Sequence, residues 1–133
     1  MKGFHSNIEQ DTINNTDFRR VVYTGKHSQL VYMSLRPREE IGLETHNEND
    51  QFLRFEGGEG KCYIDDNVYD VSDGFAIIVP AGARHNVRNT GNQPLKLYTI
   101  YGPPEHKDGI VQATKDDADA RHQDEEWDGK TTE

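Results

Sequence analysis

The stretch from Gly74 to Asn89, which reads GFAIIVPAGARHNVRN, constrains the fold more than any other part of this chain. Its apolar, β-branched front half predicts a buried strand. The Pro-Ala-Gly segment that follows predicts a turn, because proline fixes φ and glycine accepts positive φ. His85 then opens the next strand just after the turn. A histidine held in this way is a candidate metal ligand or base, although a partly buried histidine bonded to backbone fits the same pattern.

Short apolar runs between glycine and proline turns continue along most of the chain. They predict further strands at residues 18–24, 30–35, 51–56, 61–64, 68–71 and 95–101. In the last of these runs, alternation places four side chains on one face: Leu95, Leu97, Thr99 and Tyr101. No hydrophobic period typical of a helix occurs before residue 110. Many short strands at close spacing predict an all-β sandwich or barrel.

Composition limits the partners and the compartment. The 133 residues carry a net charge of −9, whereas nucleic acids and anionic membranes need a basic protein face, so neither is expected as a partner. The single cysteine, Cys62, allows no disulfide within the chain and favours a reducing compartment. No apolar run approaches the roughly 18 residues of a membrane span, and the N-terminus lacks the apolar segment of a signal peptide. We therefore expect one cytoplasmic domain.

The two ends of the chain are polar. Residues 1–16 predict an extended arm. From Lys115 onward, eight acidic residues stand against three basic ones, which predicts a short helix around residues 116–127 or a disordered segment. Trp127 could dock on a partner subunit, but a solubilising tail fits the composition better, with His122 exposed to solvent.

A second group of polar side chains precedes a predicted strand in the first half of the chain. Glu44 and His46 are two residues apart, so on a strand they face the same side. Gln51 begins the next strand, and Gly58 follows it by seven residues, at a turn. Side chains from this segment could meet His85 inside a barrel.

Together, the two stretches resemble the cupin family. The second motif of that family is glycine, five residues, Pro-x-Gly, two residues, histidine, three residues and asparagine, and the chain matches it at every position: Gly74, Pro80, Gly82, His85 and Asn89. The first motif is glycine, His-x-His, three or four residues, glutamate, six residues and glycine. Its spacing is matched, but Glu44 stands at the first histidine position and Gln51 at the glutamate position.

The resemblance implies one cupin β-barrel, or jelly roll, at residues 17–112, between the arm at 1–16 and an acidic tail at 113–133. The segment YTIYGPPEHKDG is also similar to a subgroup of single-domain bacterial cupins described as sugar-isomerase-like or mannose-6-phosphate isomerase-like. Cupins are commonly dimers, so the resemblance further implies a homodimer, with the arm and the strand at 18–24 as exchange elements.

The resemblance also implies a divalent metal held inside the barrel by Glu44, His46, Gln51 and His85. Two imidazoles and one carboxylate suit iron or manganese, with zinc and nickel as further candidates. Gln51 offers only a neutral carbonyl oxygen, but Glu44 supplies the negative charge that Gln51 lacks, so the set keeps a charge of −1. This compensation favours a retained metal site.

Two alternatives to this ligand set stay open. Glu44 and Gln51 could hydrogen-bond His46 in a cavity without metal. Alternatively, Glu48 or Asp50 could replace Gln51 as a ligand, although alternation puts Asp50 on the other face of the strand.

The side chains that line the cavity depend on the phase of each strand. Alternation from Gln51 points Leu53 and Phe55 inward and Arg54 outward. On the strands whose phase is open, four side chains are candidates: Tyr32, Ser34, Tyr98 and Ile100. His106, after the last strand, fits a surface loop better than a cap over the barrel mouth.

The implied ligand set bounds the function. A metal with two histidines, one carboxylate and open positions can bind oxygen or polarise an enolisable substrate. We therefore expect a metal-dependent dioxygenase or isomerase that acts on a small oxygenated organic molecule or sugar. The alternative is a binding or sensing module that holds a small sugar or organic acid without turning it over. The sequence leaves open whether the protein is an enzyme.

Overall fold

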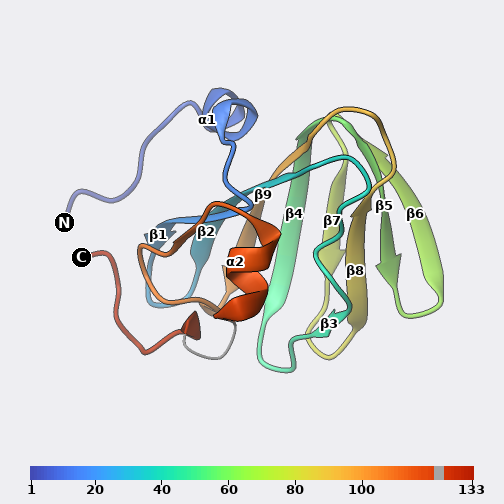
Figure 1. Ribbon diagram of the computed structural model, residues 1–133. Helices are drawn as coiled ribbons and strands as arrows, with labels where there is room; N and C mark the ends of the chain where they lie inside the picture. Colours follow the sequence, from blue (N-terminus) through green and yellow to red (C-terminus); the bar gives the residue numbers. More distant parts are fainter. Residues whose placement is uncertain (122–124) are drawn as a thin grey trace.

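Two antiparallel sheets form the computed structural model, which describes residues 1–121 and 125–133 (Figure 1). Within these residues, one sheet has six strands in the order β10-β1-β2-β9-β4-β7, and the other has four in the order β3-β8-β5-β6. The strands are β1 (Arg19–Thr24), β2 (Gln29–Leu35), β3 (Glu44–Thr45), β4 (Asp50–Gly57), β5 (Glu59–Ile64), β6 (Asn67–Ser72), β7 (Ala76–Val79), β8 (Arg84–Asn89), β9 (Leu95–Gly102) and β10 (Val111–Gln112). The same residues include the helices α1 (Ile8–Asn14) and α2 (Lys115–Ala120). The predicted all-β barrel of the jelly-roll type is confirmed.

β9 is central to the barrel core because it pairs with β2 on one side and with β4 on the other. The register places Leu97 opposite both Met33 and Phe55, and none of these three residues is exposed. Burying one such side chain contributes about 1.5–3 kcal/mol. The face of β9 that alternation predicted is the buried one, and Leu53 and Phe55 of β4 are buried with it.

The candidate cavity residues on β2 and β9 lie on the outer face of the six-stranded sheet. Tyr98 and Ile100 alternate with the buried residues of β9 and so point away from the core. Tyr32 pairs directly with Tyr98 and shares this outer face. It is buried there because α1 packs over the sheet, and its hydroxyl donates to Asp11 at 3.3 Å. The four candidates therefore do not line the barrel interior: Tyr32, Ser34, Tyr98 and Ile100. The sequence left the phase of these strands open, and β2, which is mostly apolar and buried along its whole length, gives no alternation that could have settled it.

The N-terminal arm is not extended throughout, since its second half forms α1. Asn7 caps this helix, and its side-chain oxygen accepts from the Gln10 N–H at 3.2 Å. Glu9 and Asp11 lie in the first turn, where acidic side chains interact favourably with the helix dipole. The prediction of an extended arm is wrong here because the helix is too short to show a hydrophobic period.

Helix α2 occupies only the first part of the acidic tail. Thr114 caps it, and the Thr114 side chain accepts from the Asp117 N–H at 3.1 Å. The helix ends at Ala120, so it is shorter than the predicted range of 116–127. His122 lies outside the described residues.

Residues 125–133, named here the C-terminal strap, run back along the barrel (Figure 1, red). The Lys107 N–H donates to the Glu125 carbonyl at 2.9 Å, and the Trp127 N–H donates to the Glu105 carbonyl at 3.0 Å. The interpretation of the tail as merely solubilising is therefore wrong for this segment, because its backbone is bonded to the loop after β9.

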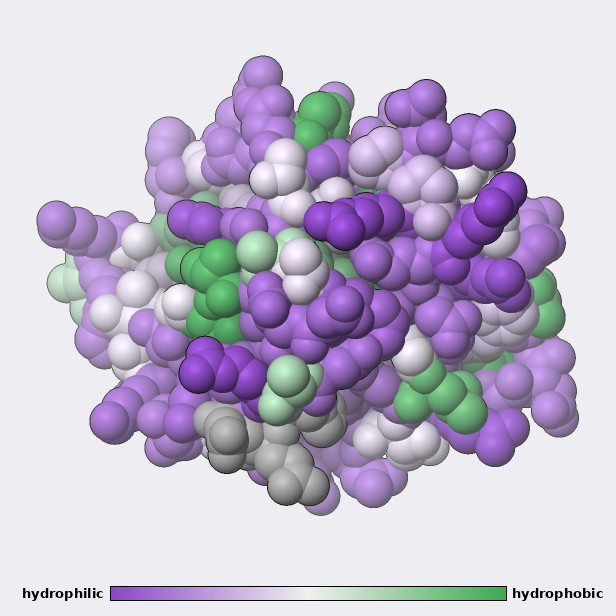
Figure 2. Space-filling model, viewed as in Figure 1, coloured by the Kyte–Doolittle hydropathy of each residue, from purple (hydrophilic) through white to green (hydrophobic). Residues whose placement is uncertain are grey.

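The face seen in Figure 2 is mostly hydrophilic, as expected for a chain with a net charge of −9. Among the described residues, no helix is long and apolar enough to cross a membrane. Cys62 is buried, and burial raises the pKa of its thiol to about 12. The thiol therefore stays protonated, and Cys62 acts as a core side chain.

Candidate metal centre

His85 is positioned by the turn between β7 and β8. Gly82 in this turn has a φ of +90°, which favours glycine, and its N–H donates to the His46 carbonyl at 2.9 Å. The turn is thereby tied to the segment that carries the other histidine. β8 is paired on both sides, with β3 and β5, and this pairing fixes the direction of the His85 side chain.

The far end of β8 is fixed by Asn89, which is fully buried. Its Nδ2 donates to the carbonyls of Leu35 at 3.0 Å and Gln93 at 2.9 Å. Its Oδ1 accepts from the Gly91 N–H at 2.9 Å. Asn89 therefore shapes the next turn and ties it to the end of β2, and its role in the motif is structural.

The ring of His85 presents one available nitrogen. Nδ1 lies 3.0 Å from the Ala83 carbonyl oxygen, which can only accept a hydrogen bond. Nδ1 therefore carries the proton of the neutral ring, and Nε2 keeps its lone pair. A backbone carbonyl commonly orients a metal-binding histidine in this way.

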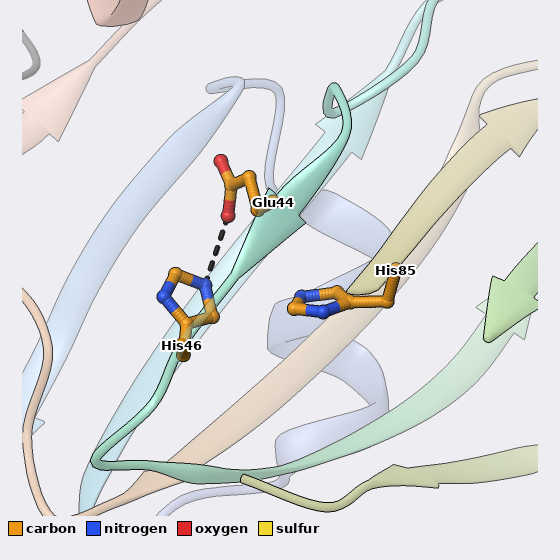
Figure 3. Close-up of side chains that lie close together, drawn as sticks. All are labelled: Glu44, His46 and His85. Atoms are coloured by element: carbon orange, nitrogen blue, oxygen red, sulfur yellow. Dashed lines mark ion pairs between the residues drawn. The ribbon is translucent and has the colours of Figure 1, made fainter. Parts of the chain in front are cut away.

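Glu44 and His46 lie on and just after β3 and face His85 across the site (Figure 3). The register pairs Glu44 directly with His85, so both side chains lie on one face of the sheet. His46 Nε2 lies 2.9 Å from Glu44 Oε2, and His46 Nδ1 lies 3.4 Å from Glu105 Oε1. Ligand atoms of Glu44, His46 and His85 all lie within 4.8 Å of one another. The structure thus brings three of the four predicted ligands together.

The charges of this cluster are coupled. Burial by itself lowers the pKa of His46, but the carboxylates of Glu105 and Glu44 outweigh burial and raise that pKa to about 9. For Glu44, burial alone raises the pKa, but the hydrogen bond from His46 and the charge of Arg19 bring it below its usual value. Without a metal, His46 is an imidazolium beside two carboxylates, so a metal must displace the Nε2 proton in order to bind there.

Gln51, the fourth predicted ligand, is 3% exposed and lies on the buried face of β4. Its Nε2 donates to Thr99 Oγ1 at 3.0 Å. Its Oε1 is buried and has no hydrogen-bond partner among the described residues. Leaving a buried oxygen without a partner costs about 1–3 kcal/mol of folding free energy, and a nearby cation would interact with it favourably. The donor set therefore fits a divalent metal, while direct ligation by Gln51 stays a prediction.

The acidic loop before β4 does not supply a substitute for Gln51 in the cluster. Asp50 is exposed, and its Oδ1 accepts from the Ala81 N–H at 2.9 Å. Ligation by Asp50 is therefore wrong, because its carboxylate faces the turn outside the barrel. Glu48 is exposed too, and it lines a pocket beside His46 without joining the cluster.

Tyr101 and His106 flank the cluster, and the sequence assigned neither of them to the site. The ring of Tyr101 meets His46 edge-on, with centroids 5.8 Å apart, and meets His106 in the same way at 5.2 Å. Burial raises the pKa of the Tyr101 hydroxyl, which therefore stays protonated. The interpretation of His106 as a surface-loop residue is wrong, because it is 8% exposed and packs against Tyr101.

Arg19 brings a buried positive charge to the site. It pairs directly with Met33 of the core and is itself 5% exposed, so its side chain also points inward. Its Nη1 donates to Gln112 Oε1 at 2.8 Å, and its charge helps to keep Glu44 ionised. The alternation of Arg19 with the buried Val21 is the sequence signal that could have revealed it.

Comparison with known proteins identifies the family. A family model for the cupin domain matches residues 31–101, more than half of the chain. The chain belongs to the cupin family. It is 52% identical over 126 residues to the uncharacterized protein YrkC of Bacillus subtilis, covering 88% of this chain and 66% of that protein, slightly less than two thirds. It is 39% identical over 113 residues to the uncharacterized protein L612 of Acanthamoeba polyphaga mimivirus, covering 82% of this chain and 71% of that one.

A solved structure agrees with the fold of this cupin. The crystal structure of BH2720 from Bacillus halodurans superposes with a TM-score of 0.88 at 48% identity, covering 90% of this chain and 95% of that chain. The names of these relatives state no activity. Membership of a sugar-isomerase-like subgroup therefore stays a prediction.

The cupin has a pocket of about 460 Å³ beside the cluster, and His46 belongs to both. The loop after β3 contributes Glu48, the loop after β9 contributes Glu105, and the C-terminal strap contributes Glu126 and Trp127. The strap therefore forms one wall of the approach to the candidate metal centre. No short-range pattern in the sequence connects Glu105 or the strap with the two motifs.

Proposed function

We propose that this cupin is a metal-dependent enzyme, a dioxygenase or an isomerase, that acts on a small oxygenated organic molecule or sugar. One observation carries the proposal: ligand atoms of Glu44, His46 and His85 lie within 4.8 Å of one another, beside a pocket of about 460 Å³. Two imidazoles and one carboxylate favour iron or manganese. A metal held there would supply a Lewis acid, and iron would add reactivity toward oxygen.

The chain supplies groups that orient these ligands. The Ala83 carbonyl holds His85 through Nδ1, and the Glu105 carboxylate holds His46 through Nδ1. A carbonyl or carboxylate on the far ring nitrogen fixes the ring and raises the basicity of the ligand. In both histidines, Nε2 is therefore the nitrogen proposed to face the metal. Gln51 would add a neutral oxygen, which a substrate could displace.

Metal analysis of the purified protein tests the first part of this proposal. We expect about one equivalent of iron or manganese by plasma mass spectrometry, and loss of that metal in Glu44→Ala and His46→Ala. His27→Ala is the matched control, because His27 is exposed and outside the cluster. A wild-type protein that binds neither metal after reconstitution would contradict the proposal.

Turnover assays test the second part against the competing function, non-catalytic binding or sensing. The metal-loaded protein should consume oxygen with a small oxygenated substrate, or should isomerise a sugar in a proton NMR assay. His85→Ala should abolish either activity. A protein that binds sugars but returns them unchanged, with or without metal, would replace the enzyme with the binding module.

A homodimer is part of the same proposal. β1 is paired with β10 and β2, so it does not present an open edge for exchange over residues 19–20. β7 lies at the edge of its sheet, and its Ile78 is 66% exposed and directly opposite Phe52. An apolar edge of this kind favours pairing with a second copy. Light scattering should give the mass of a dimer, and Ile78→Lys should yield monomers; a monomeric wild type would contradict a dimer.

A further inference from the structure

The pocket beside His46 has an excess of negative charge. Three carboxylates line it, those of Glu48, Glu105 and Glu126. No lysine or arginine occurs among its described lining residues. Lys107 and Lys130 follow the lining residues Glu105 and Trp127 closely in sequence, but neither lysine lines the pocket. An anionic group entering this pocket would meet like charge, whereas a cation would be attracted.

One of the three carboxylates is already engaged. Glu105 Oε1 lies 3.4 Å from His46 Nδ1, and the raised pKa of His46 reflects this contact. Glu48 and Glu126 are exposed, and neither forms an ion pair among the described residues. Their charges are therefore available to a ligand.

Trp127 supplies an aromatic wall on the strap side of the pocket. Its backbone N–H donates to the Glu105 carbonyl at 3.0 Å, and its Nε1 donates to the Lys130 carbonyl at 2.8 Å. Both N–H groups of Trp127 are thus occupied, and the residue lines the pocket. A tryptophan face close to carboxylates is a favourable place for an ammonium group.

The inner end of the pocket is formed by His46, which also belongs to the candidate metal centre. The His46 side chain is 9% exposed, and its Nε2 is buried. Nε2 forms an ion pair with Glu44 Oε2 at 2.9 Å and has no other partner among the described residues. A ligand that fills the pocket thus reaches the candidate metal centre at this histidine.

We propose that the pocket selects a small organic cation that also carries a hydroxyl or carbonyl oxygen. The ammonium group lies against Trp127 near Glu48 and Glu126, and the oxygen points toward His46. The orientation of the oxygen rests on the proposed metal function, whereas the preference for a cation rests only on the pocket. The same charges exclude phosphorylated sugars, which a mannose-6-phosphate isomerase-like protein would have to bind.

Three probes of one shape and different charge test this proposal: choline, 3,3-dimethylbutan-1-ol and 3,3-dimethylbutanoate. The first is a cation, the second its uncharged isostere and the third an anion. Titrations of the full chain at low salt, followed by NMR, should show choline binding at least about tenfold tighter than the alcohol, with the anion weakest. Comparable binding of all three, or a Kd for choline weaker than about 10 mM, would overturn the proposal.

Variants locate the preference in the pocket. Glu126→Gln should weaken choline binding several-fold and leave the alcohol unchanged, whereas Trp127→Leu should weaken both and Trp127→Phe should restore part of the loss. Asp66→Asn, at an exposed hairpin turn, is the charge-matched control. An unchanged preference for choline in Glu126→Gln would contradict the assignment, provided thermal melting shows an intact fold.

Titration with and without metal separates this proposal from the proposed function. A preference for choline in a protein that takes up no iron or manganese supports the cation pocket and rejects the metal enzyme. Uptake of metal without any preference among the three probes supports the metal centre and rejects the cation pocket. The two ideas can therefore fail separately.

Discussion

The two histidines of the candidate centre are held by different means. His85 lies on β8, which is paired on both sides, and the backbone carbonyl of Ala83 orients its ring. His46 follows the two-residue β3, and carboxylates lie beside both of its ring nitrogens. Backbone geometry thus positions one ligand, and side-chain charge positions the other. We expect the orientation of His85 to depend on the backbone, and His46 to respond to its charged neighbours and to pH.

Removal of His85 should have the largest effect. No neighbouring side chain in its strand can replace the imidazole, so His85→Ala should weaken metal binding by more than about 100-fold. Metal content after dialysis, measured by plasma mass spectrometry, checks this. Retention of one equivalent of metal in a folded His85→Ala protein would remove His85 from the ligand set.

The pH dependence of the unfolding free energy should come from His46 and the carboxylates beside it. In the metal-free protein the pKa of His46 is about 9, against roughly 6.5 in an unfolded chain. The folded state therefore binds the proton more tightly, so this stabilisation is complete below about pH 6.5 and is lost as pH rises through 9.

Urea titrations at several pH values measure this loss, which should amount to at most about 3 kcal/mol of unfolding free energy. His46→Ala should remove the slope above pH 6.5, and His85→Ala should keep it. Equal slopes in both variants would contradict the distinction between the two histidines.

Neutralising Glu105 should weaken the metal site without removing a ligand. Glu105→Gln takes the carboxylate away from His46 Nδ1, and changes of this kind lower metal affinity by about 10- to 100-fold. Calorimetric titration with Mn²⁺ checks the effect. Glu126→Gln makes the same change in the same pocket without a contact to His46, so it should leave Mn²⁺ affinity nearly unchanged.

The smallest effect is expected from Gln51→Glu. A carboxylate in place of the unpartnered amide oxygen should tighten Mn²⁺ binding by about tenfold. The variant also loses the hydrogen bond to Thr99, so the metal-free protein should be less stable by about 1–3 kcal/mol. Unchanged Mn²⁺ affinity, measured by calorimetry, would place Gln51 outside the ligand set.

The fold could be predicted to the extent that backbone geometry dictates residue type. Gly74 and Gly82 have φ values of +89° and +90°, and Asn89 is buried and bonded to three backbone groups, so the second motif encodes its own turns. The strands of the barrel followed from apolar runs between such turns. α1 could not be found in this way because its short length leaves only a cap at Asn7 as a signal.

The site could be predicted only where its residues are close in sequence. The motifs contain Glu44, His46 and His85, and their spacing was sufficient to bring them together. Glu105, Arg19 and Trp127 reach the same region from distant segments, and long-range packing decides their positions. The face of Tyr101 was predicted correctly, but its contact with His46 depends on how the two sheets meet.

The C-terminal strap has a consequence for how such a protein could change its ligand. Backbone bonds dock Glu125 and Trp127, from the Lys107 N–H and to the Glu105 carbonyl, and the Gln112 side chain also donates to the Glu125 carboxylate. The side chains at positions 126 and 127 can therefore vary while the docking stays the same. Ligand selectivity could therefore change in evolution, or in a library of variants at positions 126 and 127. Neither change would need to alter the stability of the barrel or the positions of the ligand histidines.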